Sequence, residues 1–199
     1  LSADAAFLSE NINDSETNVR GDLSAELTVD PNQALTGNIT AGMEDLRWLA
    51  AFVPEFSNIE GALNGQANIS GSISAPAVTG ILTLENAAVS FDRLGISVND
   101  ISAEIKSLDS VSIQIVGSAG SDSGTIQYQG QLLDALTEAR VLSAQVTGSN
   151  FQLINIPDLQ LEVSPALTLS ANSEQVELNG SLHVPLFNLS LEELPEYAT

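Results

Sequence analysis

The stretch from Ile59 to Ile73, I-E-G-A-L-N-G-Q-A-N-I-S-G-S-I, alternates between two kinds of residue. Its odd-numbered positions carry isoleucine, leucine, alanine or glycine, and its even-numbered positions are mostly small and polar. Side chains of a strand point to opposite faces with a period of two, so the pattern predicts a strand covered on one side and wet on the other.

The same alternation recurs along most of the chain, with turn-forming residues between the segments. The expected strand segments cover 23–29, 35–41, 78–84, 94–98, 101–105, 111–115, 126–130, 142–148, 159–163, 167–171 and 176–184. Breaks are expected at 74–76, at the glycine- and serine-rich run 117–124, and at Pro185, which closes the series. Spacings of about 8–12 residues are typical of antiparallel meanders rather than of βαβ units.

One segment follows a helical period instead. Leu46, Leu49, Ala50 and Val53 form a stripe at i, i+3, i+4 and i+7, and Pro54 follows it, which predicts a short amphipathic helix near 43–53. Such a helix has two interpretations. It is a plug at one end of the sheet, or it presents Trp48, Phe52 and Phe56 as a mobile gate or docking face.

One short helix cannot cover so many strands, so the apolar sheet face has to be buried in another way. A sandwich usually fills the space between its sheets with large aromatic residues, and aromatic residues make up only 5% of this chain. The composition therefore favours an all-β fold, a curled antiparallel sheet (a β-taco) with an apolar groove and one short helix. A plain sandwich remains the alternative. We interpret residues 1–199 as a single β-taco segment of a longer protein, with 1–18 as a disordered tail.

The charge balance excludes several classes of function. Five Lys and Arg residues stand against 26 Asp and Glu, for a formal net charge of −21. Nucleic-acid binding depends on cationic neutralisation of phosphates, and docking to anionic headgroups needs a basic patch, so neither is expected. There is no cysteine, and no apolar run reaches the roughly 18 residues of a membrane-spanning helix. The first residues lack the pattern of a signal peptide, which suggests a cut within a longer chain.

Residues for chemistry are few. His183 is the only histidine and alternates outward between Leu182 and Val184, so it is interpreted as an exposed strand residue. No second histidine could complete a metal site with it, and no Ser-His-Asp grouping has support in the sequence. We therefore predict no catalytic residue, no metal site, no cofactor and no enzyme activity.

Several runs resemble the C-terminal region of the TamB family. They are Leu35-Thr36-Gly37, Asp45-Leu46 with Leu49 and Pro54, the stretch 59–65, the stretch 69–82, and Gly180 to Pro185 followed by Leu194-Pro195. The spacing of Gly71, Pro76 and Gly80 after the expected helix is the most specific part. The resemblance covers about residues 20–199.

The resemblance implies more than the alternation does. TamB-like proteins are inner-membrane-anchored proteins of the Gram-negative periplasm, with a taco-shaped sheet around a hydrophobic interior. They are similar to AsmA-like and bridge-type lipid-transfer proteins, and are implicated in phospholipid passage to the outer membrane. They pair with the outer-membrane barrel protein TamA and are linked to assembly of outer-membrane proteins and autotransporters. Compared with a whole family member, we expect this chain to lack the N-terminal anchor and the terminal stretch that meets the barrel, so a TamA contact is expected through the parent protein.

Two functions follow as hypotheses. The first is a hydrophobic groove segment for phospholipid acyl chains in intermembrane lipid transport that supports outer-membrane biogenesis. The second is a scaffold or chaperone for outer-membrane protein or autotransporter assembly, acting by strand addition at a free sheet edge. The predicted groove lining is Leu63, Ile69, Ile73, Leu82, Leu84, Ile101, Ile105, Ile113, Ile115, Leu159, Leu161, Val163, Leu178 and Leu182.

Overall fold

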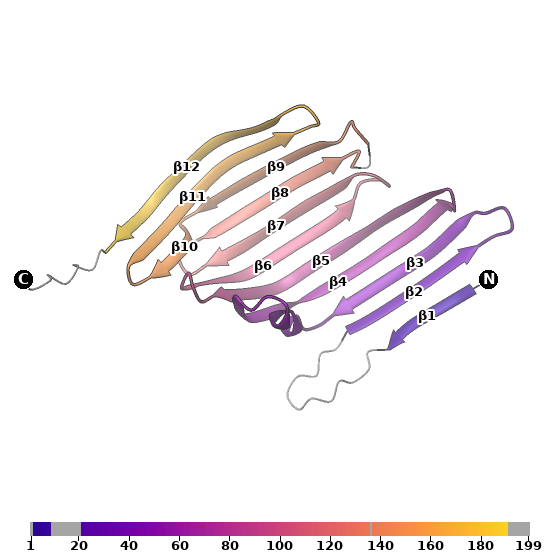
Figure 1. Ribbon diagram of the computed structural model, residues 1–199, viewed down its shortest axis with the longest axis horizontal. Coiled ribbons are helices and arrows are strands. Elements are labelled where there is room, and N and C mark those ends of the chain that lie inside the picture. The colour runs from indigo at the N-terminus through magenta and orange to yellow at the C-terminus, as the bar shows by residue number, and fades with distance from the viewer. Residues whose placement is uncertain (1, 9–20, 136, 191–199) are drawn as a thin grey trace, which may run out of the picture.

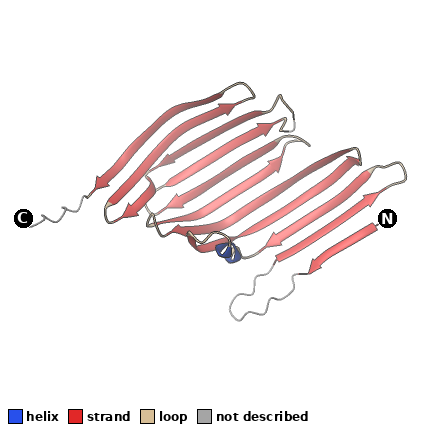
Figure 2. Ribbon diagram, in the orientation of Figure 1, coloured by secondary structure: helices blue, strands red, loops and turns tan. Residues whose placement is uncertain are grey.

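The computed structural model describes residues 2–8, 21–135 and 137–190, and most of them lie in strands (Figures 1 and 2). The strands are β1 Ser2–Leu8, β2 Gly21–Val29, β3 Leu35–Met43, β4 Phe56–Ser72, β5 Ala75–Phe91, β6 Ile96–Ser107, β7 Ile113–Ser121, β8 Thr125–Leu133, β9 Val141–Ser149, β10 Phe151–Ile156, β11 Leu159–Ala171 and β12 Val176–Leu189. One short 3-10 helix, η1, covers Arg47–Ala51.

All twelve strands belong to one antiparallel sheet. Neighbours in the chain are neighbours in the sheet from β1 to β9. β9 and β10 then follow each other along one edge of β11, and β12 pairs with the other edge. β1 and β12 lie at opposite margins, and the sheet does not close (Figure 1). The predicted all-β, curled antiparallel fold is confirmed, and the alternative of two packed sheets is wrong for the described part of the chain.

Three bulges keep the apolar residues on one face of the long strands. Asn58 in β4, Asn86 in β5 and Asp100 in β6 each have a positive φ of 50–51° at a shift of register. An extra residue in a strand reverses the alternation beyond it. At these same positions the apolar residues of the sequence also shift by one place in the alternation. The two changes cancel, so the apolar residues stay on one face of the sheet. The two short segments expected at 94–98 and 101–105 are accordingly one strand, β6.

Several other expectations need correction. The helix near 43–53 is a single 3-10 turn, because Met43 is already paired in β3, opposite Leu63, and β4 begins at Phe56. The run 117–124 is not a turn throughout, because β7 continues to Ser121. Pro185 lies inside β12, where the register to β11 shifts. Within the expected tail 1–18, residues 2–8 form β1, and 9–18 lie outside the described residues.

The buried apolar residues gather at the bulged end of the sheet. Ile59, Ala87, Ile96, Ala119, Phe151 and Val163 are 6–8% exposed. β10 reaches past the short β7–β8 hairpin to the turn between β5 and β6. There the main-chain N–H of Asn155 donates to the Leu94 carbonyl oxygen at 2.7 Å. This contact fills the space beyond the ends of β7 and β8 and gives the sheet a small core there.

Candidate functional site

A continuous row of apolar residues and glycines crosses the sheet. In cross-strand register the row reads Leu23, Ala41, Gly65, Leu82, Ile105, Ile115, Gly130, Ala144, Leu169 and Leu178. Residues directly opposite each other in register share one face of the sheet. The row therefore extends from β2 to β12 without a polar side chain.

One neighbouring row on this face is apolar except for the Tyr128 hydroxyl, and the row on the other side is apolar except for Ser107, which is opposite Ile113 in register. The first of these rows contains Met43, Leu63, Leu84, Ala103, Gly117, Tyr128, Val146, Leu167 and Gly180. We call this side of the sheet the apolar face. None of its described residues carries a charge, whereas the opposite face carries residues such as Glu104, Lys106 and Glu162. The alternation predicted for 59–73 therefore holds for the sheet as a whole.

The apolar face is not covered by the rest of the described chain. Leu82 is 36% exposed, Ile113 40% and Leu178 64%, and none of the described side chains is fully buried. A monomer rarely leaves a large contiguous apolar patch in water, and such patches mark binding surfaces. The uncovered face is thus the candidate functional site.

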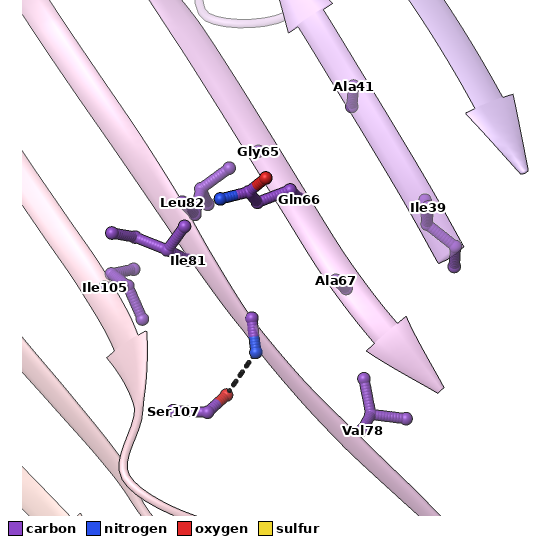
Figure 3. Close-up of a pocket in the computed structure, with 11 residues that line it drawn as sticks. Ile39, Ala41, Gly65, Gln66, Ala67, Val78, Ile81, Leu82, Ile105 and Ser107 are labelled. Carbon is purple, nitrogen blue, oxygen red and sulfur yellow. Dashed lines mark hydrogen bonds between the residues drawn. The ribbon is translucent and has the colours of Figure 1, made fainter. Parts of the chain in front are cut away.

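Two hollows lie on the apolar face. The first has a volume of about 290 Å³ and lies over β3 to β6, between Ile39, Val78, Leu82 and Ile105 (Figure 3). The second has a volume of about 260 Å³ and lies over β7 to β9, between Ile115, Leu132, Leu142 and Val146. A third hollow, of about 430 Å³, lies on the opposite face and is bordered by glutamine, serine and threonine side chains.

Register places most of the predicted lining residues on the apolar face. Leu63, Leu82, Leu84, Ile105, Ile113 and Ile115 are neighbours across β4 to β7. Ile69 pairs with Val78 toward one end of these strands, and Ile101 pairs with Ala87 toward the other. Leu159, Leu161 and Val163 lie between β10 and β12, and Leu178 and Leu182 lie on the β12 margin. Ile73 is in the turn after β4, 57% exposed.

The sequence reasoning missed the small residues of the hollows. Ala41, Ala67 and Ala144 follow the same alternation as their larger neighbours, but the predicted lining contains only large aliphatic residues. Phe187 was missed for another reason. The shift of register near Pro185 brings it opposite Leu161, which the alternation before Pro185 does not predict.

One polar side chain crosses the apolar face. The Tyr128 hydroxyl of β8 donates to the Ser102 carbonyl oxygen of β6 at 2.9 Å. Its ring lies over Gly117 of the intervening β7, where a Cβ would come within 2.4 Å of the ring. Burial raises the pKa of the Tyr128 phenol above its usual value. The hydroxyl is therefore neutral at physiological pH and adds no charge to the face.

The expected gate residues do not form one group. The rings of Trp48 and Phe52 in the η1 region contact each other edge to face, with ring centroids 5.8 Å apart. Phe52 is 73% exposed. Phe56 belongs to β4 and contacts Phe91 instead, with ring centroids 4.6 Å apart. Asp45 accepts hydrogen bonds from the Arg47 side chain, which lower the pKa of its carboxyl group.

Within the ranges described, His, Cys, Asp and Glu form no group of three or more that could hold a metal ion. The outward position of His183 agrees with its register opposite Ser164. Among the same residues, no helix combines the length and the apolar character that crossing a bilayer requires. The geometry is that of an open β-sheet with an uncovered apolar face.

The comparisons with known proteins name the family. Residues 3–84 match the model of the TamB N-terminal domain, and residues 114–199 match that of the TamB C-terminal domain. The chain belongs to the TamB family. The resemblance to the TamB family is thereby confirmed. The runs between 35 and 82 were assigned to the C-terminal region, and this part is wrong, because they match the N-terminal-domain model instead. Searches of curated proteins and of solved structures gave no significant match. Membership supports a role in a TamB-type transport and assembly protein of the cell envelope.

Proposed function

We propose that the apolar face is a segment of a phospholipid conduit in a periplasmic, inner-membrane-anchored protein of a Gram-negative bacterium. The conduit supports outer-membrane biogenesis, and the parent protein works with a TamA-like barrel in the outer membrane. The observation that carries the proposal is the uncovered apolar row from Leu23 to Leu178, continuous across β2 to β9, β11 and β12.

Hydrocarbon is the ligand that this surface fits. An acyl chain gains about 0.8 kcal/mol for each methylene that leaves water. Among its described residues the face offers no charged side chain to hold a particular headgroup, so we expect weak selectivity among phospholipids. The predicted lining, from Leu63 on β4 to Leu182 on β12, supplies the contacts.

Electrostatics argue against a second copy of the chain as the occupant. Each copy carries a formal net charge of −21, and two copies placed face to face would bring their acidic loops and margins together. Like charges oppose such an approach at low ionic strength. A neutral acyl chain covers the face without this cost.

Charge placed on the apolar face tests the conduit. A cation is placed where hydrocarbon would lie by the variants Ile69→Arg, Ile113→Arg and Leu161→Arg. We expect each variant to lose lipid transfer in cells. We also expect less lipid to copurify with the chain, as measured by mass spectrometry. Gln114→Arg adds the same charge beside Ile113 but on the opposite face, and should leave both unchanged. Normal transfer by the three variants would exclude the proposal.

A photocrosslinker tests the orientation without adding charge. Placed at position 113 it should crosslink to lipid, and placed at position 114 it should not. Equal crosslinking from both positions would mean that lipid coats the chain without regard to face.

The second candidate is a scaffold or chaperone for outer-membrane proteins or autotransporters. It is favoured by β12, which is exposed along its whole length and pairs with β11 alone within the described part of the chain. Such a margin can accept another strand by main-chain hydrogen bonds.

Adjacent proline variants separate this function from the conduit. Successive N–H groups of a strand alternate between its two edges, so one of Glu177→Pro and Leu178→Pro removes a donor from the free edge while keeping the ladder to β11. A scaffold loses client assembly in that variant and tolerates Ile113→Arg. A conduit tolerates that proline variant and loses lipid transfer in the Ile113→Arg variant.

A further inference from the structure

The floor of the apolar face is not level. In the central row, β3 and β4 contribute Ala41 and Gly65, and β8 and β9 contribute Gly130 and Ala144. Between these pairs, Leu82, Ile105 and Ile115 stand on β5, β6 and β7. Small side chains therefore lower the floor in two places, and large ones raise it between them.

The first low place is the hollow of Figure 3, which we call the β3–β6 seat. Its floor is formed by Ala41, Gly65, Ala67 and Gly80, and Leu82 and Ile105 border it. Gln66 and Ile81 alternate to the opposite face and reach the hollow at its floor, where the adjacent glycines leave the main chain bare. The Gly80 amide donates to the Ser107 hydroxyl at 3.0 Å, so this backbone group is already satisfied.

The second low place is the hollow over β7 to β9, which we call the β7–β9 seat. Gly130 and Ala144 form its floor, Ile113 and Ile115 border one side, and Tyr128 belongs to its lining. The Tyr128 hydroxyl is held by the Ser102 carbonyl, so it offers the hollow no free donor.

A pair of isoleucines divides the two seats. Ile105 borders the β3–β6 seat, Ile115 borders the β7–β9 seat, and the two residues are directly opposite each other in register. Within the part of the chain that the structure describes, the two hollows share no lining residue. Hydrocarbon that passes along the central row from one seat to the other must cross this pair, and in the next row the seats adjoin at Ser107 and Ile113.

We propose that the apolar face holds acyl chains at two separate seats, over β3–β6 and over β7–β9, with the Ile105–Ile115 pair as the barrier between them. This inference rests on the proposed function and deepens it, because it replaces a uniform apolar surface with discrete binding positions for the acyl chain. A lipid then moves along the sheet in steps.

The occupant is a hydrocarbon chain rather than a peptide. The main-chain groups beneath the seats are engaged in the sheet ladder, as in the pairing of β4 with β3 and β5. A peptide lying on this face would find no partners for its own N–H and C=O groups, and unpaired polar groups are costly at an apolar surface. An acyl chain has no such groups.

Single-cysteine reporters test the seats in the 199-residue chain, which has no native cysteine. An environment-sensitive dye is attached at Ala67→Cys, Ala144→Cys or Ala166→Cys, and the chain is mixed with phosphatidylcholine vesicles that carry a spin-labelled acyl chain. Position 166 lies on the opposite face, because Ala166 pairs with Thr147 and Ser181. We expect quenching at 67 and 144 and none at 166.

Filling one seat then shows whether the two are independent. Ala41→Leu narrows the β3–β6 seat and should weaken lipid quenching of the dye at 67 by about tenfold, the effect of losing contact with roughly two methylenes. Quenching at 144 should not change. Val146→Phe is the reciprocal variant, with the dye again at 144, and circular dichroism establishes that each variant retains the sheet.

Each remaining outcome has a distinct meaning. If either filling variant weakens quenching at 67 and 144 equally, the seats are one continuous film; the inference is then wrong and the proposed function stands. If quenching at 166 matches that at 67, lipid adheres without using the face, and the inference fails. If no position is quenched, the face does not hold acyl chains and the proposed function fails as well.

Discussion

The bulged end of the sheet and its middle are built from the same strands, yet they differ in what covers their apolar residues. At the bulged end Ile59, Ile96 and Phe151 are 6–8% exposed, whereas Leu82 and Ile113 in the middle are 36–40% exposed. The residue types are similar, so the difference arises from the bulges and from β10, which adds chain beyond the ends of β7 and β8 at one end of the sheet only. Stability and binding are therefore assigned to different parts of one sheet.

The largest expected effect is at the bulged end. Phe151 pairs with Val163 across β10 and β11 and is 6% exposed, so Phe151→Ala removes a ring from a packed position. We expect the free energy of unfolding to fall by about 3 kcal/mol, measured by urea denaturation.

The matched control is Phe52→Ala, since Phe52 is 73% exposed in the η1 region. It should leave the midpoint of unfolding close to that of the parent chain. Equal losses in the two variants would show that β10 does not anchor a core, and the comparison would be wrong.

The sequence predicts the strands of both regions but not the difference between them. Two-residue alternation is a local signal, and it identified the apolar phase of β4 and the strand character of most of the sheet. Burial at the bulged end depends on β10 reaching Leu94, a contact between segments about sixty residues apart, and no local pattern carries that information. The segment Phe151–Ile156 was not expected as a strand at all.

The helix and the seats are two further features that the sequence could not predict correctly. The stripe from Leu46 to Val53 has a helical period, but the pairing of Met43 and the start of β4 at Phe56 leave room for only one 3-10 turn. The phase of the lining residues could be predicted, whereas the two hollows could not. A hollow depends on which small residues become neighbours across strands, as Gly65 does with Ala41, and register fixes this only in the folded sheet.

A pair of glycine variants tests the same difference between the two regions, with smaller expected effects on stability. Gly61, beside the bulges, has a φ of 127°, and a Cβ there would come within 2.7 Å of the Ala87 Cβ. Gly61→Ala should therefore cost about 2 kcal/mol of unfolding free energy, from backbone strain and the contact together. The cost is measurable by thermal and urea unfolding.

Gly65→Ala is the counterpart in the middle of the sheet. Its nearest contact would be the Leu82 Cδ1 atom at 3.0 Å, the far end of a flexible side chain on an open face. The variant should lose less than about 1 kcal/mol, because Leu82 can turn aside. A loss as large as that of Gly61→Ala would mean that the middle of the sheet is as tightly packed as the bulged end.

The smallest effect is expected at Tyr128, which links β6 and β8 across Gly117. Tyr128→Phe removes the hydrogen bond to the Ser102 carbonyl oxygen but keeps the ring, so the loss should be about 1 kcal/mol at neutral pH. Burial raises the pKa of the folded phenol above 10.0, so an unfolded chain releases this proton at lower pH than the folded chain does. The stability that the parent chain draws from the neutral phenol is complete below pH 10.0 and is lost as the pH rises through the folded pKa. The stability difference between parent and variant should therefore narrow in alkaline solution.

Tyr128 can be followed directly because the chain has only two tyrosines. In a Tyr197→Phe background, the ultraviolet absorbance of the phenolate reports Tyr128 alone, and its titration should shift to lower pH when the chain is unfolded in urea. Identical titrations of the folded and unfolded chains would show that the ring is open to water, and the middle of the sheet would then lack the one local cover that Tyr128 gives it.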